Sequence, residues 1–250
     1  MLILSFDTSS LAGSVALLDG ARLLGESVLD PAKRSAQTLA PAIAELLATH
    51  EVKATQIGLV ATTTGPGSFT GLRVGVTTAK TFAYAAEAEV LGVSTLEVIA
   101  LQAAEKLEGL AVGSPIQAVL DAQRRELFLG RFRLEADASG DDELPVLTRL
   151  APDGIVAADA WLAGLEAGTI VSGRGLEKIR ERVPADVRMA ASESWEPRAA
   201  VVGRLAWRDY CAGRREDLWG LMPVYLRLSY ADEKVKGPVA DAGTRVGPGS

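Results

Sequence analysis

The sequence has very few of the side chains that most often bind metals, form cross-links or act as nucleophile and base. Its 250 residues include one cysteine and one histidine, Cys211 and His50. One thiol cannot form an internal disulfide, and one imidazole does not provide the usual Cys and His ligand set of a zinc site. A Ser or Cys triad would have to use His50, and neither Ser68 nor Cys211 stands in a nucleophile motif. We therefore expect no catalytic residue, no metal and no cofactor, and we interpret His50 as a helix-end residue in favourable contact with the helix dipole.

The chain also lacks long hydrophobic runs. No stretch reaches the roughly 18 uncharged apolar residues of a membrane-spanning helix, and the N-terminal apolar run ends at Asp7. The first residues lack the basic start, the longer apolar segment and the cleavage site of a secretory signal. Together with the single cysteine, these absences predict a cytoplasmic protein that does not contact membranes.

An excess of basic residues is missing as well. The formal net charge of −6 argues against a protein that grips nucleic acid by itself, because such proteins usually carry a basic face. The one local candidate for a small basic face is the group Arg124, Arg125, Arg131 and Arg133. A solvated strand and turn is the favoured interpretation of this group.

The first half of the chain alternates apolar runs with turn residues. Asp19-Gly20 is a hairpin signal between two of these runs, and Pro41 is expected to bend the first helix or leave its first turns irregular. Hydrophobic spacing predicts strands at 2–6, 14–18 and 22–28, a helix at 36–49, a strand at 57–61 and a long helix ending near residue 88.

The second half repeats this order less cleanly. The pattern predicts strands at 116–120, 126–134 and 144–150, a helix at 158–165, a strand at 169–172 and a helix at 176–182. Asp7 and Asp121 each close the first strand of their half, which indicates an internal duplication. The expected fold class is therefore α/β, with duplicated ribonuclease-H-like lobes, as in the superfamily of actin-like kinases and Hsp70.

We expect a first lobe at 1–105, a second and smaller lobe at 106–228, and a flexible tail at 229–250 that is polar and rich in Gly and Pro. A further helix at 199–212 is expected to pack back near the junction of the lobes.

Residues 65–76, GPGSFTGLRVGV, are the most informative stretch. Gly65, Pro66 and Gly67 allow a sharp turn after a buried strand, and Ser68 can cap the helix that follows. The turn could also hold an anion at the helix N-terminus, but no Lys-Ser/Thr pair follows at the spacing of a P-loop. A structural turn is the favoured interpretation.

The helix after this turn carries a stripe of small residues. Gly71, Gly75, Ala79 and Ala83 recur at every fourth position and share one side of the helix. Glycine in a helix costs roughly 1 kcal/mol relative to alanine, so the stripe needs a physical reason, and close approach of another backbone is that reason. The pattern alone leaves open whether the neighbour belongs to the same chain or to a second subunit.

Several ordered motifs resemble the TsaB family, also called YeaZ. The opening ILSFDTSSLAGSVALLD resembles the first hairpin of that family, and GPGSFTGLRVGVTTAK is its most specific signature. VSTLEVIA at 93–100, DAQRRELFLGRF at 121–132 and PVYLR at 223–227 follow in the expected places, so the resemblance covers Met1 to about Arg227. Arg34 stands where the family often has histidine, so no role of that histidine is carried over.

The resemblance implies a non-catalytic scaffold and dimerization subunit. Its expected partner is TsaD, which transfers threonylcarbamoyl to the tRNA adenosine beside the anticodon; the small ATPase TsaE joins the pair. A homodimer is expected when TsaD is absent, and tRNA contact only through the complex. By analogy with the family, the subunit interface is expected at Leu39, Ile43, Leu47, Gly71, Val74, Gly75, Thr78, Ala79, Phe82 and Ala83.

Two other functions compete with the scaffold. The first is an ATP-dependent small-molecule kinase of the same superfamily, in which one glycine-containing loop per lobe brings bare backbone N–H groups to the phosphates. Residues 7–13 fit such a loop, but residues 121–126, DAQRRE, contain no glycine. Asp7 and Asp121 are more simply explained as turn formers at strand ends than as a metal-binding pair. The second competitor is a homodimeric binding module with an unrelated ligand.

Overall fold

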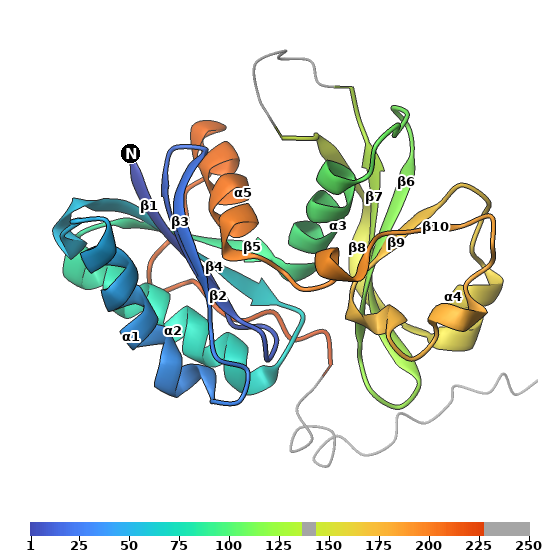
Figure 1. Ribbon diagram of the computed structural model, residues 1–250, viewed down its shortest axis with the longest axis horizontal. Helices are drawn as coiled ribbons and strands as arrows, with labels where there is room; N and C mark the ends of the chain where they lie inside the picture. The colour runs from blue at the N-terminus through green and yellow to red at the C-terminus, as the bar shows by residue number, and fades with distance from the viewer. Residues whose placement is uncertain (137–143, 228–250) are drawn as a thin grey trace, which may run out of the picture.

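The computed structural model describes residues 1–136 and 144–227 and contains two five-stranded sheets placed side by side (Figure 1). The first sheet consists of β1 (Leu2–Asp7), β2 (Ser14–Asp19), β3 (Arg22–Val28), β4 (Ile57–Gly65) and β5 (Glu89–Ser94), in the order β3-β2-β1-β4-β5. The three N-terminal strands are antiparallel to one another, and β4 and β5 run parallel to β1.

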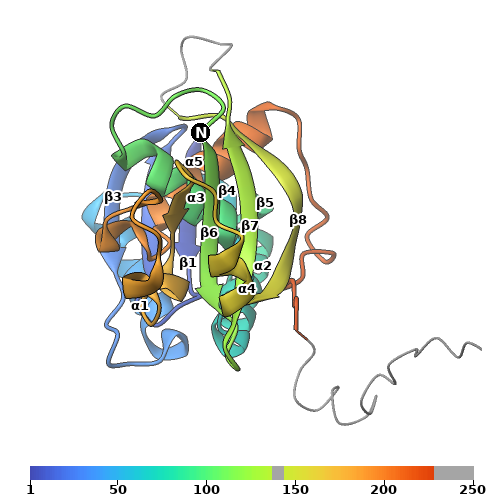
Figure 2. The ribbon, with the colours of Figure 1, turned by 90° about the vertical axis from the view of Figure 1, so that its right-hand side faces the viewer.

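The second sheet repeats this topology strand for strand. It consists of β6 (Pro115–Asp121), β7 (Glu126–Leu134), β8 (Leu147–Ala157), β9 (Ile170–Ser172) and β10 (Arg188–Met189). Its order is β8-β7-β6-β9-β10, with β6, β7 and β8 antiparallel and with β9 and β10 parallel to β6. Figure 2 shows β6, β7 and β8 next to one another, with β8 at the edge of the sheet. The expected duplication of ribonuclease-H-like lobes, the fold class of actin-like kinases and Hsp70, is confirmed.

Three helices cover the first sheet, and one of them comes from the far end of the chain. Helices α1 (Ser35–Thr49) and α2 (Phe69–Ala86) pack on one face, against Leu4, Phe6 and Leu17 among others. Helix α5 (Ala199–Cys211) packs on the other face (Figure 1).

The second sheet is covered on one face by a helix from the first half of the chain. Helix α3 (Thr95–Lys106) follows β5, yet its apolar residues pack against β6, β7 and β9. The short helix α4 (Ala158–Ala163) and the 3-10 turn η2 (Arg174–Leu176) lie around the opposite face, and the 3-10 turn η4 (Ser192–Ser194) contacts α3. Because α3 and α5 are exchanged between the sheets and also touch each other, the lobe boundary at residue 105 stays a prediction.

Several boundaries differ from the expectation. The predicted helix at 176–182 is wrong: α-helical geometry is broken at Ile179, where φ is −127°, and two 3-10 turns, η2 and η3 (Arg180–Arg182), stand in its place. Strand β8 runs to Ala157 rather than ending at residue 150. Strand β5 completes the second helix-strand step of the first half, and helix α3 follows it. The predicted tail at 229–250 lies outside the described residues, and no helix within 1–136 and 144–227 could span a membrane.

Candidate functional site

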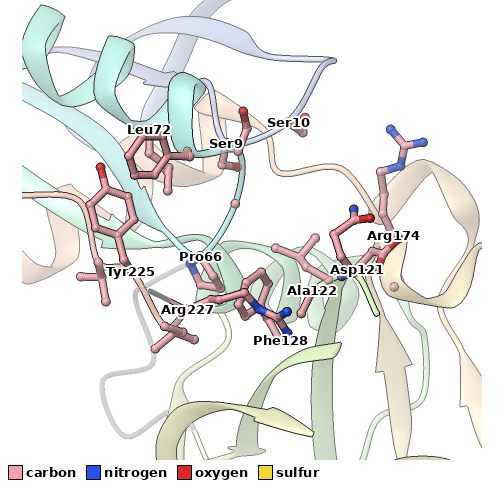
Figure 3. A pocket seen from close by; sticks show the side chains of 18 of the residues that line it. Ser9, Ser10, Pro66, Leu72, Asp121, Ala122, Phe128, Arg174, Tyr225 and Arg227 are labelled. Carbon is pink, nitrogen blue, oxygen red and sulfur yellow. Dashed lines mark hydrogen bonds between the residues drawn. The ribbon is translucent and has the colours of Figure 1, made fainter. Parts of the chain in front are cut away.

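A cleft of about 1170 Å³ opens between the two lobes. Ser9, Ser10 and the turn at 66–69 form its first-lobe wall, and Asp121, Phe128 and Arg174 belong to its second-lobe wall (Figure 3). The remaining side is formed by the last described residues, 224–227. This is the position at which the fold could accept a ligand.

Asp7 lies at the base of the first-lobe loop and is fully buried. Its Oδ1 accepts hydrogen bonds from the Ser9 N–H at 3.1 Å, from Ser9 Oγ at 2.6 Å and from Thr63 Oγ1 at 2.6 Å. Burial raises the pKa of Asp7 to about 6, although the hydrogen bonds from Ser9 and Thr63 oppose this shift. The carboxyl group therefore holds the loop after β1 in its turn.

Asp121 closes β6 in a similar way but with a cation beside it. Its Oδ1 accepts from the Gln123 N–H at 2.8 Å, and its Oδ2 pairs with Lys178 Nζ at 2.7 Å. Partial burial opposes ionisation, yet the Lys178 and Gln123 hydrogen bonds outweigh it and lower the pKa of Asp121. Among the described residues, no group of three or more His, Cys, Asp or Glu is arranged to hold a metal ion.

The second-lobe loop has an unusual backbone. Gln123, Arg124 and Arg125 have φ angles of 65°, 53° and 62°, so three successive residues with side chains occupy the left-handed region. Such a conformation costs roughly 1–2 kcal/mol per residue relative to right-handed geometry. All three residues are exposed at the turn, and they place side chains where a nucleotide-binding loop of this fold would bring glycine backbone to phosphate.

The arginines of the sequence do not form one basic face. Arg124 and Arg125 lie in the turn before β7, whereas Arg131 and Arg133 lie near the far end of that strand. A strand rises about 3.4 Å per residue, so the two pairs are well separated.

His50 is the C-terminal cap of α1 and packs against Gly25, and Cys211 is exposed at the end of α5.

A C-terminal strap, residues 213–227, runs from α5 along α2 to the mouth of the cleft. The Val224 N–H donates to the Thr64 carbonyl at 2.8 Å, and Arg227 forms an ion pair with Glu126 of the second lobe. Gly65 is required beneath the strap, because its φ is +127° and a Cβ there would lie 2.7 Å from the Val224 carbonyl oxygen. The strap thus closes one side of the cleft and connects both lobes.

A second group of ion pairs joins the lobes at the helices that they exchange. Glu97 of α3 accepts from Arg149 of β8 at 3.1 Å and from Arg208 of α5 at 3.0 Å. Arg204 of α5 pairs with Glu105 of α3 at 2.6 Å. These side chains are half-buried, so the pairs are less screened by solvent than surface pairs are.

The turn before α2 is packed tightly against the loop after β1. A Cβ on Gly67 would lie 2.6 Å from the Ser9 carbonyl oxygen. The Ser68 N–H donates to that carbonyl at 2.7 Å, and Ser68 Oγ caps α2 by accepting from the Gly71 N–H at 3.2 Å. Gly65, Gly67 and Ser68 therefore position the first turn of α2 at the cleft.

The small-residue stripe of α2 faces the chain's own first lobe. Gly71, Gly75, Ala79 and Ala83 are all buried. A Cβ on Gly71 would lie 1.9 Å from the Thr8 carbonyl oxygen, and one on Gly75 would lie 2.5 Å from Thr8 Oγ1. The expectation that this stripe meets a second subunit is therefore corrected: its close neighbours are the loop after β1 and strand β4. Replacing Gly75 with Leu would disturb this packing and would not report on partner binding.

The other residues expected at the interface support the helices from within. Leu39, Ile43 and Leu47 are buried in the core beneath α1. Val74, Thr78 and Phe82 are half-buried, and Val74 and Phe82 pack against the same core. A regular apolar pattern along a helix marks the side that packs in the core of its own chain. In this chain that side faces the first sheet.

One group of exposed residues on the two helices forms a different surface, which we call the outer face; the exposed Glu45, Phe69, Arg73 and Tyr84 lie outside this group. It consists of Gln37, Ala40, Pro41, Ala44 and Ala48 of α1 and Thr70, Thr77, Thr81 and Ala85 of α2. These residues are small or polar and uncharged. The signal that could have revealed this surface in the sequence is the near absence of charge at the exposed helix positions, which is unusual for a solvated helix.

Comparison with known proteins adds independent findings. The sequence model of the family described as "TsaD: tRNA N6-adenosine threonylcarbamoyltransferase" matches residues 27–179. The chain is 28% identical to the tRNA threonylcarbamoyladenosine biosynthesis protein TsaB of Bacillus subtilis, over 94% of this chain and 97% of that protein. It is 27% identical to the protein of the same name from Escherichia coli, over 95% of this chain and 99% of that protein. The solved structure of YeaZ from Pseudomonas aeruginosa matches with a TM-score of 0.72 at 28% identity, over 90% of this chain and 99% of that one.

Proposed function

The chain belongs to the TsaB (YeaZ) family of tRNA threonylcarbamoyladenosine biosynthesis proteins, and on that premise we propose that it is a non-catalytic subunit that docks and supports TsaD. In this proposal TsaD transfers the threonylcarbamoyl group to the tRNA adenosine beside the anticodon. TsaE joins through the pair of subunits, tRNA is bound through the complex, and the assembly works in the cytoplasm. A homodimer forms when TsaD is absent.

The outer face of α1 and α2 carries the proposal. These helices have 15 and 18 residues, of which only Glu45, Arg73 and Lys80 are charged, whereas 23% of the whole chain is charged. Depletion of charge is typical of the core of a protein interface. Small side chains such as Ala40 and Ala44 also let a partner helix approach closely.

The match to the TsaD family model favours TsaD as the occupant of this face. A relative described by the same model is expected to carry an equivalent pair of helices on its own first lobe. Two such pairs could pack helix against helix, in the manner of a four-helix bundle. The same geometry permits a second copy of this chain to cover the outer face when TsaD is absent.

Three features of the structure support a subunit without chemistry of its own. The loop at 121–126 has no glycine and projects side chains at its left-handed turn. The strap closes one side of the cleft through Val224 and Arg227. Ion pairs around Glu97 join the lobes, whereas kinases of this superfamily close one lobe on the other around their substrate.

The cleft itself is the observation that favours the competing function, an ATP-dependent small-molecule kinase, because its volume would admit a nucleotide. The two functions differ in what the purified chain binds. Isothermal titration with purified TsaD is expected to show a one-to-one complex, and absence of any complex would overturn the scaffold proposal.

A further inference from the structure

The exposed aromatic side chains of the described chain gather on one ridge beside the outer face. Phe69 and Tyr84 of α2 and Trp219 and Tyr225 of the strap are exposed by 41%, 67%, 66% and 40%. The other aromatic residues within 1–136 and 144–227 are buried or half-buried. We call these four side chains, with Arg73 and Lys80 between them and Met222 and Val224 beside them, the aromatic ridge. One end of the ridge, with Phe69, Arg73, Val224 and Tyr225, also lines the cleft.

The ridge is held in place by contacts within the chain. The Phe69 and Tyr225 rings lie 4.9 Å apart, and Arg73 stacks on Phe69 at 3.9 Å while its Nε donates to Tyr225 Oη at 3.0 Å. The Tyr84 and Trp219 rings lie 5.8 Å apart.

Lys80 fastens the strap to α2. Its Nζ donates to the carbonyls of Trp219 at 2.8 Å and of Leu221 at 3.1 Å, and the Leu221 side chain is buried in the first-lobe core. The exposed rings therefore lie on a fixed backbone. Binding of a partner over these rings would therefore cost little conformational entropy of this chain.

The charged side chains that α2 contributes to the ridge are both cations. Arg73 and Lys80 are the only charged residues of α2. The strap carries two carboxylates before Trp219: the exposed Asp217 accepts from the Gly220 N–H at 2.6 Å, and the half-buried Glu216 accepts from the Gly92 N–H at 2.6 Å. In a chain with a net charge of −6, this surface is complementary to an apolar segment flanked by carboxylates.

We propose that the aromatic ridge is a second docking surface for TsaD, which fits an apolar segment of that partner bordered by acidic side chains. This inference rests on the proposed function, and it is linked to the outer face because α2 contributes to both surfaces. Exposed Trp and Tyr beside Arg are the residue types that most often dominate binding energy at protein interfaces. Met and aromatic residues are enriched there, whereas a surface built to follow phosphates needs more free cations than Arg73 and Lys80 provide.

The test measures the affinity of TsaD for the full chain and for the Trp219→Ala and Tyr84→Ala variants. Each variant is expected to weaken binding about tenfold or more, and rising salt is expected to weaken binding of the unaltered chain. Val112→Ala removes an apolar side chain that is 64% exposed away from the ridge and should leave the affinity unchanged. Both ridge residues are exposed, so a thermal melt within a few degrees of the unaltered chain shows that the fold is kept.

A further variant separates this inference from the proposed function. Ala44→Arg probes the outer face alone. If Ala44→Arg weakens binding and the two ridge variants do not, the outer face stands and the ridge assignment is overturned. If only the ridge variants weaken binding, the ridge stands and the outer face fails. Tight binding of an anticodon stem-loop RNA to the isolated chain, lost on Trp219→Ala, would overturn the ridge as a protein site and assign it to RNA.

Discussion

Gly71 and Thr8 are in direct backbone contact: Thr8 Oγ1 donates to the Gly71 carbonyl at 2.8 Å, and a Cβ on Gly71 would lie 1.9 Å from the Thr8 carbonyl oxygen. This contact seats the first turn of α2 on the loop that follows β1. The small-residue stripe therefore packs within the first lobe. Only the outer side of α2 is available for contact with a partner.

Gly71→Ala should destabilise the fold. The added methyl group would collide with the backbone at Thr8, which cannot rotate away. This overpacking is expected to outweigh the gain in helix propensity, so the variant should lose about 3 kcal/mol of unfolding free energy. Urea denaturation measures the difference. Gly154→Ala is the matched control, since a Cβ there meets no atom within 4 Å. Equal stability of the two variants would contradict the packing described for α2.

Asp7→Asn should gain stability relative to the unaltered chain as the pH rises. Burial raises the pKa of Asp7 from 3.8 to about 6 in the folded state, so the folded carboxyl holds its proton more tightly than the unfolded one. Its contribution to stability is fully present below pH 4 and is lost as the pH rises through 6. An asparagine removes the charge but places amide N–H groups where Asp7 Oδ2 has no hydrogen-bond partner among the described residues. The pKa shift therefore predicts that the stability of the variant relative to the unaltered chain rises by the order of 3 kcal/mol between pH 4 and pH 8, at 1.36 kcal/mol per pKa unit.

The Asp7 prediction is checked by urea denaturation of both proteins at pH 4 and pH 8. The stability of the variant relative to the unaltered chain is expected to be higher at pH 8 than at pH 4. A difference that does not change with pH would mean that the Asp7 carboxyl is not held neutral by burial.

Gln123→Gly should stabilise the second-lobe turn by about 1 kcal/mol, because glycine adopts a positive φ without steric cost. The Gln123 N–H that binds Asp121 is retained in the variant. Gln37→Gly, in the exposed part of α1, should instead destabilise by about 0.5–1 kcal/mol. Thermal unfolding of the pair tests whether the φ of 65° at Gln123 is a strained position.

The isolated chain should not bind ATP with magnesium in the micromolar range. The 121–126 loop has no glycine and projects side chains at its 123–125 turn, and the strap covers one side of the cleft, so this loop offers no bare backbone to phosphate. Calorimetric titration with ATP is the direct check. Saturable micromolar binding would favour the kinase over the scaffold.

Local patterns in the sequence predicted much of the first lobe. The runs at 2–6, 14–18 and 22–28, with the turn at Asp19-Gly20, become β1, β2 and β3, because alternating burial and hairpin chemistry are local properties. The long helix after residues 65–68 is present as α2. The duplication was visible because Asp7 and Asp121 end equivalent strands.

Features that depend on distant contacts were not visible in the same way. A stripe of small residues indicates close approach but not the neighbour, and Thr8 is brought to Gly71 only by the fold. The strap has no hydrophobic period, since its path is set by single contacts of Lys80, Leu221 and Val224. The exchange of α3 and α5 between the sheets is likewise decided by tertiary packing.

The most direct test of the scaffold proposal compares TsaD binding by Ala44→Arg and Ala160→Arg, two exposed helix alanines on α1 and α4. Both variants should melt like the unaltered chain. A large guanidinium on the outer face is expected to weaken TsaD binding at least tenfold, since an unpaired charge would be buried against a partner helix, whereas Ala160→Arg should bind normally. Equal, unaltered affinity of both variants would contradict docking through α1 and α2.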